Sequence, residues 1–160
     1  MLELPQEFYK DAIRPGLAVY GYGSGIVSPI LSIYAPIIKI AFVRQGEHIS
    51  YGDYTAPRDM LVASIRAGYA DGIRRKADPN ADNRFVSVNG VLCPIVGQVC
   101  MDITMVDVSK VKICYRDKVF VLGNGISAND IALAENTNVY EVLTSFKGRV
   151  NRRYIKPRFN

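Results

Sequence analysis

The sequence is poor in the residues that metal sites, disulfide frameworks and membrane spans require. It contains no tryptophan, one histidine (His48) and three cysteines without a CxxC pair. An odd cysteine count without metal-ligand spacing argues against a zinc site and for a reducing compartment. The longest apolar run, residues 36–43, is interrupted by Lys39 and is too short to cross a bilayer, and the first residues form no secretory leader. We therefore expect a cytoplasmic protein with no bound metal.

Composition and length favour one well-packed soluble domain. The chain has 160 residues, of which 49% are hydrophobic and 22% charged, so it can bury one core and is too short for two large domains. Its net charge is +5, and the cations gather at residues 66–76 and 147–158. A basic tail with aromatic residues can bind single-stranded nucleic acid. Because no known nucleic-acid module surrounds this tail, an exposed strand or a subunit contact is the better interpretation.

Short strands dominate the expected secondary structure. Runs rich in β-branched and aromatic residues predict strands at 14–21, 31–43, 60–67, 85–88, 91–96, 104–108 and 118–122. Residues 44–47 are typical of a hairpin turn, and the Asn89-Gly90 pair is the strongest turn signal in the chain. Residues 1–13 predict a helical lead-in, and the glycine- and serine-rich residues 22–30 predict a linker.

Helical periodicity appears only near the C-terminus. Ser127 with Asp130 predicts the start of one short helix, and Asn138 predicts the start of a second, which runs to Phe146. Regularly spaced strands followed by two short helices indicate a mostly β domain. We expect it to close as a compact barrel or sandwich, because closure removes unpaired strand edges.

Two segments place a tyrosine beside a glycine at the end of an apolar run. They are residues 49–56, with Tyr51, and residues 67–72, with Tyr69. Glycine lets the backbone approach a ligand closely, and a phenol can donate or accept a hydrogen bond. From the residues alone, ordinary strand-end tyrosines are the simpler interpretation of both segments.

Other generic chemistries have weaker support. Asp71 and Asp102 are a candidate acid and base, although turn capping fits their context better. The glycine-rich residues 21–25 lack the lysine of a Walker loop, so a linker explains them better. No spacing pairs His48 with a cysteine nucleophile. Two of the cysteines lie in apolar segments and are expected to be buried thiols, namely Cys93 and Cys100.

A set of motifs, in this order along the chain, resembles the alanine racemase family. The motifs are RPGLAVYG at 14–21, ISYG at 49–52, GYADG at 68–72, PIVGQVCMD at 94–102, YEVLT at 140–144 and RVNR at 149–152. In that family an N-terminal (β/α)8 barrel holds pyridoxal phosphate on a Schiff-base lysine, and a C-terminal β domain follows. The resemblance implies that residues 1–21 are a remnant of the last helix and strand of the barrel, 22–30 the linker and 31–160 the β domain. The cofactor lysine has no counterpart here.

The resemblance implies that Tyr51 is one of two acid/base groups for the interconversion of L- and D-alanine, which supplies cell-wall precursors. It would reach across a head-to-tail homodimer, and the barrel lysine would be the opposing group. Racemisation requires two such groups on opposite faces of the substrate, because one removes the α-proton and the other returns a proton from the other side.

The substrate-binding residues carried over by the same resemblance lie in the two later motifs. Tyr69 corresponds to a tyrosine at the entrance of the site, and Arg75 to an arginine of the entry path. Met101 corresponds to the residue whose backbone N–H meets the substrate carboxylate, with Asp102 beside it. The family often has arginine where this chain has Gln98.

The cofactor-binding residues implied by the resemblance lie near the N-terminus. Arg14 corresponds to the arginine that hydrogen-bonds the ring nitrogen of pyridoxal phosphate, and Gly16 and Leu17 to backbone donors for its phosphate. An arginine stays protonated, so it disfavours protonation of the ring nitrogen and weakens the ring as an electron sink.

Two further interpretations stay open. One is a non-catalytic remnant or dimerisation module that keeps the β fold, and the other is a basic nucleic-acid-binding barrel. Under the racemase interpretation, the chain alone is expected to be inactive, because the barrel domain or a barrel fragment must supply the lysine.

Overall fold

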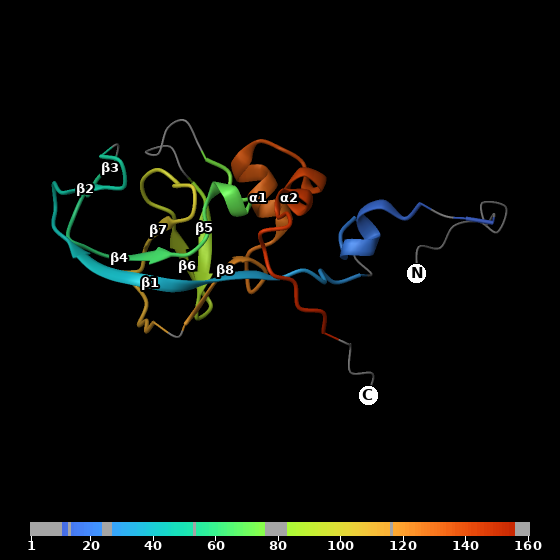
Figure 1. Cartoon of the computed structure of the whole chain (residues 1–160), viewed down its shortest axis with the longest axis horizontal. Helices are drawn as coiled ribbons and strands as arrows, with labels where there is room; N and C mark the ends of the chain where they lie inside the picture. The colour runs from blue at the N-terminus through green and yellow to red at the C-terminus, as the bar shows by residue number, and fades with distance from the viewer. Residues whose placement is uncertain are drawn as a thin grey trace.

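The computed structural model describes residues 11–12, 14–23, 27–52, 54–75, 83–115 and 117–155. Within them a six-stranded sheet forms the body of the domain, and two helices pack at one end of it (Figure 1). Its strands are β1 (Ile33–Val43), β4 (Met60–Ile65), β5 (Phe85–Val88), β6 (Val91–Pro94), β7 (Thr104–Asp107) and β8 (Lys118–Leu122). The strand order is β6-β5-β8-β1-β4-β7, and the pairs are antiparallel.

The long strand β1 joins the two halves of this sheet. Its first residues pair with β8 and its remainder pairs with β4, and its register shifts between Ile37 and Lys39. Such a bulge bends the strand and increases its twist. A separate bridge between Ile95 and Val106 connects the end of β6 to β7, which are the two outer strands of the order. The sheet is therefore a nearly closed barrel, and the expected mostly β fold is confirmed.

Aliphatic side chains fill the inside of the barrel. Along β1 the buried Ile33, Ala35 and Ile37 alternate with exposed residues, as a strand with one solvent face requires. The side chains of Ile65 and Leu122 are fully buried. Burying an aliphatic side chain of this size contributes roughly 1.5–3 kcal/mol, so the barrel has a core of its own.

Turn chemistry determines the connections at both ends of the sheet. In the β5–β6 hairpin, Asn89 and Gly90 have positive φ angles of 50° and 81°, as the two central residues of a type I′ hairpin turn require. Residues 44–47 also form a turn, with the Glu47 amide donating to the Arg44 carbonyl at 3.1 Å. The expectation of a hairpin there was wrong, because β1 pairs with β4, while β2 (His48–Ile49) pairs with β3 (Tyr54–Thr55) in a separate ribbon.

The two helices begin at the predicted caps. In α1 (Ala128–Glu135), the Ser127 hydroxyl accepts from the Asp130 amide at 3.1 Å, and the Asp130 carboxylate accepts from the Ser127 amide at 2.9 Å. In α2 (Val139–Ser145), the Asn138 side chain accepts from the Glu141 amide at 3.0 Å. Among the described residues, no helix is both long enough and apolar enough to span a membrane.

The N-terminal segment departs from the prediction. Residues 14–21 were expected to form a strand, but Gly16–Tyr20 form a 3-10 helix, η2. A strand needs a neighbour to satisfy its backbone, whereas η2 satisfies part of its own through short-range bonds that end at Gly21. Tyr22 is buried, and its hydroxyl accepts from the Ala128 amide at 3.1 Å, which fixes the segment to α1. The helical lead-in predicted for residues 1–13 falls almost entirely outside the described residues.

Candidate functional site

Tyr51 lies in the turn between β2 and β3, and its side chain is 67% exposed. The preceding residue, Ser50, has a φ of 63°, and residues other than glycine adopt this left-handed backbone conformation only at some energetic cost. The Ser50 hydroxyl donates to the Gln98 carbonyl at 2.8 Å, which ties the turn to residues 97–103, called here the Cys100 loop. The strained backbone is thus held by a contact to a segment that lies far away in the sequence.

The Cys100 loop also influences the titration of the Tyr51 hydroxyl. A hydrogen bond with the Cys100 thiol raises the pKa of Tyr51, and the nearby Tyr69 adds to the effect, while Arg75 opposes it. Cys100 itself is half-buried, so the expected burial of its thiol is only partly met, whereas Cys93 is fully in the core as predicted.

Tyr69 opens a second short helix, η3 (Tyr69–Asp71), here called the Tyr69 turn. Two backbone hydrogen bonds join it to the Cys100 loop: the Tyr69 amide donates to the Cys100 carbonyl and the Ala70 amide to the Met101 carbonyl, both at 3.0 Å. The close approach depends on Gly68, because a Cβ there would lie 2.3 Å from the carbonyl oxygens of Cys100 and Met101. Both Tyr69 and Met101 keep exposed side chains at this junction.

The carboxylates of this region act in turns and ion pairs. Asp71 accepts from the Gly68 amide at 3.0 Å and so caps its own turn, as the capping interpretation predicted. Asp102 accepts from Arg149 at 2.5 Å, and the same guanidinium lies 3.6 Å from Asp71. The bond to Asp102 raises the pKa of Arg149 further.

Arg149 was missed as a site residue at the sequence level. It lies in the basic tail, and basic tails are usually solvated, so the composition alone gave no reason to single it out. The only available signal was its membership of the RVNR motif. In the structure Arg149 contacts the Tyr69 turn, which lies about eighty residues earlier in the sequence, and the Cys100 loop, which lies about fifty residues earlier.

The three predicted cofactor residues lie at the other end of the chain. Arg14 is exposed, Gly16 opens η2 with a φ of 58°, and Leu17 packs against the core. A Cβ at Gly16 would lie 3.0 Å from the hydroxyl of Tyr140 on α2, so this hydroxyl borders the start of η2. Tyr140 is a second residue that sequence reasoning left without a role.

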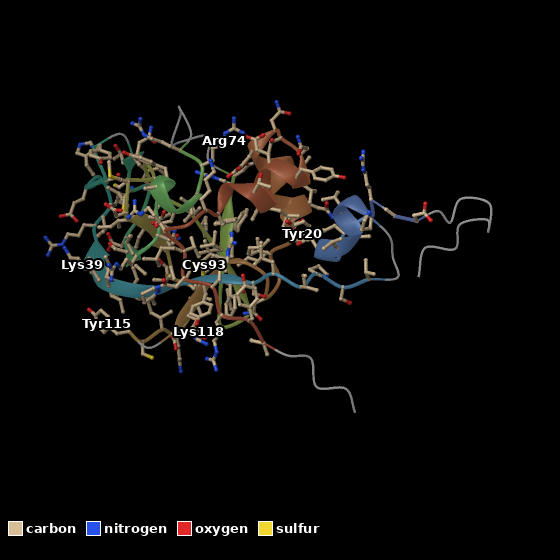
Figure 2. All side chains as sticks on the ribbon, turned by 45° about the vertical axis from the view of Figure 1, so that its right-hand side comes forward. Tyr20, Lys39, Arg74, Cys93, Tyr115 and Lys118 are labelled. Atoms are coloured by element: carbon tan, nitrogen blue, oxygen red, sulfur yellow. The ribbon has the colours of Figure 1, made fainter. Side chains whose placement is uncertain are left out.

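The two groups of candidate residues are well separated in one chain. The β2–β3 ribbon that carries Tyr51 lies at one end of the barrel, whereas η2 lies beyond α1 and α2 at the other (Figure 1). In Figure 2, Tyr20 of η2 and Lys39 of β1 lie on opposite sides of the core residue Cys93. The structure therefore brings Tyr51, Tyr69, Arg75, Met101 and Asp102 to one region, and it leaves Arg14, Gly16 and Leu17 apart from them.

Comparison with known proteins gives a consistent result. The family profile described as alanine racemase, C-terminal domain, matches residues 30–154. The alanine racemase of Thermodesulfovibrio yellowstonii is 40% identical over 156 residues, covering 94% of this chain and 42% of the relative. The alanine racemase of Clostridium novyi is 35% identical and is matched over 43% of its length.

Solved structures agree with this result. The alanine racemase of Bartonella henselae with covalently bound pyridoxal phosphate superimposes with a TM-score of 0.83 at 30% identity, covering 95% of this chain and 44% of that one. The biosynthetic enzyme of Pseudomonas aeruginosa gives a TM-score of 0.79 at 32% identity, over 90% of this chain and 42% of that one. The chain spans about two fifths of the length of these relatives. By sequence and by fold, it belongs to the alanine racemase family, of which it represents the C-terminal domain.

Proposed function

We propose that this chain is the part of a pyridoxal-phosphate-dependent alanine racemase that supplies the tyrosine acid/base, Tyr51, for the interconversion of L- and D-alanine. The observation that carries the proposal is that the turn with Tyr51 and the Tyr69 turn are both hydrogen-bonded to the Cys100 loop, through the Ser50 hydroxyl to the Gln98 carbonyl and the Tyr69 amide to the Cys100 carbonyl. The charge of Arg75 also acts on the Tyr51 phenol. A mere β scaffold has no need to gather two exposed tyrosines and an arginine. A cytoplasmic location and a role in peptidoglycan precursor supply belong to the same proposal.

The state of Tyr51 determines which half of the proton transfer it can perform. Its pKa is raised above the ordinary value, chiefly by the hydrogen bond with the Cys100 thiol, so in this domain the phenol is protonated at neutral pH. In that state Tyr51 can give a proton to one face of the substrate. To accept a proton instead, it needs a further cation that stabilises the phenolate, since Arg75 alone does not overcome the opposing contributions.

The chain also contains residues that fit one end of pyridoxal phosphate. Gly16 and Leu17 are the first residues of η2, where backbone amides have no carbonyl within the helix, and the Tyr140 hydroxyl borders them. Two amides and a hydroxyl are suitable donors for a phosphate, and the exposed Arg14 is near in sequence for the ring nitrogen. When bound, the cofactor would supply an electron-withdrawing ring that acidifies the α-proton of the amino acid.

The separation of the two groups supports a head-to-tail dimer. The β2–β3 ribbon, whose turn contains Tyr51, and η2, which begins at Gly16, lie at opposite ends of the domain (Figure 1), so these residues can serve one substrate only if they come from different copies. Each complete site would then combine the Tyr51 region of one protomer with the cofactor end and the barrel of its partner. The barrel domain, or a fragment of it, would supply the lysine for the opposite face.

Reconstitution tests this proposal directly. The purified chain alone is expected to show no racemisation of L-alanine with added pyridoxal phosphate, and mixing or co-expressing it with a barrel fragment from a close relative should restore turnover. Tyr51→Phe should then abolish most of the activity, because the phenol is the proton carrier. Tyr115→Phe, an exposed tyrosine on the loop before β8, is the matched control and should have no effect. Unchanged turnover in Tyr51→Phe would remove this residue from the mechanism.

A further inference from the structure

We propose that Arg149 is a positioning residue that holds the Tyr69 turn and the Cys100 loop together at the substrate entrance. By the substrate entrance we mean the exposed junction of these two segments, which presents the side chains of Tyr69 and Met101. The inference rests on the proposed function only for the identity of the substrate that enters there. The contact between the two segments is a property of this chain itself.

The geometry of the guanidinium carries the inference. One of its nitrogens, Nη2, donates to Asp102 at 2.5 Å, and another, Nε, lies 3.6 Å from Asp71. Asp71 ends the Tyr69 turn, whereas Asp102 belongs to the Cys100 loop, so a single planar group links one carboxylate from each. A guanidinium suits this task because its donors point in fixed directions and its charge does not titrate near neutral pH.

The link acts beside two backbone bonds that could open without it. The amides of Tyr69 and Ala70 donate to carbonyls of the Cys100 loop, and Tyr69 and Met101 are exposed residues. If Arg149 lost its charge, Asp71 and Asp102 would remain as two neighbouring carboxylates on segments that must touch. Like charges at this range repel each other, so the segments would separate more often.

The same two charges matter for the substrate under the proposed function. An amino acid presents a carboxylate to this entrance, and unpaired Asp71 and Asp102 would repel it. Arg149 therefore contributes in two ways, by keeping Tyr69 and Met101 in place and by neutralising the carboxylates beside them. Its charged contacts are with Asp71 and Asp102, so it acts through these neighbours.

Amide hydrogen exchange in the full 160-residue chain tests the positioning role without any cofactor or barrel. In Arg149→Gln, the amides of Tyr69 and Ala70 should exchange several-fold faster than in the parent, while amides of the core strand β7 keep their rates. Arg149→Lys should give an intermediate rate, because an ammonium can pair with one carboxylate but does not bridge both in this geometry.

Two further variants make this test specific. Arg153→Gln removes an exposed cation from the same tail and should leave the Tyr69 and Ala70 amides unchanged. Adding Asp102→Asn to Arg149→Gln should recover part of the lost protection, since it removes one of the repelling carboxylates. Unchanged exchange in Arg149→Gln, or an equal rise at every amide including β7, would overturn the positioning role.

Kinetics of the reconstituted enzyme test the substrate side separately. Arg149→Gln should raise KM for alanine more than it lowers kcat, and Asp102→Asn in the same chain should reverse part of the KM change. A fall in kcat with KM unchanged would contradict the electrostatic part of the inference. If no combination, the parent included, shows activity, the proposed function fails, and the exchange data still decide whether Arg149 positions the two segments.

Discussion

Replacing Gly68 by alanine should weaken the junction that carries Tyr69 and Met101. Gly68 has an extended backbone, with a φ of −143°, so alanine meets no conformational obstacle there. The obstacle is steric, since the new Cβ would lie 2.3 Å from the carbonyl oxygens of Cys100 and Met101. Carbon and oxygen normally approach no closer than about 3.3 Å, so the two segments would have to move apart by about 1 Å.

The size of the effect follows from what this movement breaks. Overpacking of a close contact costs about 1–3 kcal/mol. The bonds from the Tyr69 and Ala70 amides to the Cys100 loop, each 3.0 Å long, would lengthen beyond a useful distance. Each such bond contributes about 1 kcal/mol, so we expect Gly68→Ala to lower the free energy of unfolding by about 3–5 kcal/mol. This is a large part of the stability of a small domain, which is typically about 5–15 kcal/mol.

Urea denaturation at neutral pH, followed by circular dichroism, measures this change directly. Gly148→Ala is the matched control, because a Cβ at Gly148 would meet nothing within 4 Å and its φ is not positive. That variant should be neutral or slightly more stable, since alanine restricts the unfolded chain. If Gly68→Ala unfolds at the same urea concentration as Gly148→Ala, the close approach of the Tyr69 turn and the Cys100 loop is wrong.

Two further predictions concern titratable groups. The pKa of Asp117 is lowered by hydrogen bonds from the Cys114 amide, the Asn89 side chain and the Cys114 thiol. A carboxylate with a lowered pKa stabilises the folded state at pH values above its unfolded-state pKa of about 4. This stabilisation is lost as the pH falls through the pKa of the folded state. Asp117→Ala should therefore lose stability at pH 7 and differ less from the parent at pH 3, and an equal difference at both values in urea titrations would contradict this. Burial raises the pKa of the Cys93 thiol and shields it from solvent. Under native conditions a thiol reagent should therefore label the exposed Cys114 first, the half-buried Cys100 more slowly and Cys93 only on unfolding. Early labelling of Cys93 in a mass-spectrometric time course would contradict its burial in the core.

The sequence predicted those parts of the fold that short-range chemistry determines. Asn89-Gly90 requires positive φ at two successive residues, and Ser127 with Asp130 satisfies the first amides of a helix, so each element could be located without its neighbours. Strand pairing over longer distances was less accessible. The turn at residues 44–47 was predicted correctly, but the apolar residues on either side of it do not reveal which strand pairs with β1. In the structure that partner is β4 and not β2.

Residues 14–21 show the opposite limit. Their composition favours a strand, and strand propensity is realised only where a neighbouring strand accepts the backbone bonds. In this chain the segment lies against α2, with Gly16 beside Tyr140, and forms η2. Propensity could not reveal this outcome, because it depends on what surrounds the segment in space.

For the site, the motifs located the residues and the structure added the contacts. Tyr51 and Tyr69 were recognised from their glycine neighbours and from the family resemblance, yet only the structure joins the turn with Tyr51 to the Cys100 loop, through Ser50 and Gln98. Arg149 belonged to a tail whose charge had suggested solvent, a subunit or nucleic acid. Nucleic-acid binding would depend on the cations of this tail. Arg149 is paired with Asp71 and Asp102, and Arg152 donates to the Phe146 carbonyl, so both cations already have partners within the domain.

The two candidate regions also differ in what they need in order to form. The Tyr51 region depends on contacts inside the barrel: Ser50 bonds to Gln98, Tyr69 bonds to Cys100, and the strands beneath them enclose a core of their own. The region around Gly16 depends on a short segment held outside the barrel by Tyr22 and α1. The acid/base half of the proposed site can therefore be preorganised in this chain alone. Under the proposed function, the cofactor half would acquire its remaining groups from a barrel, so positioning would be measurable in the isolated chain while catalysis would require reconstitution.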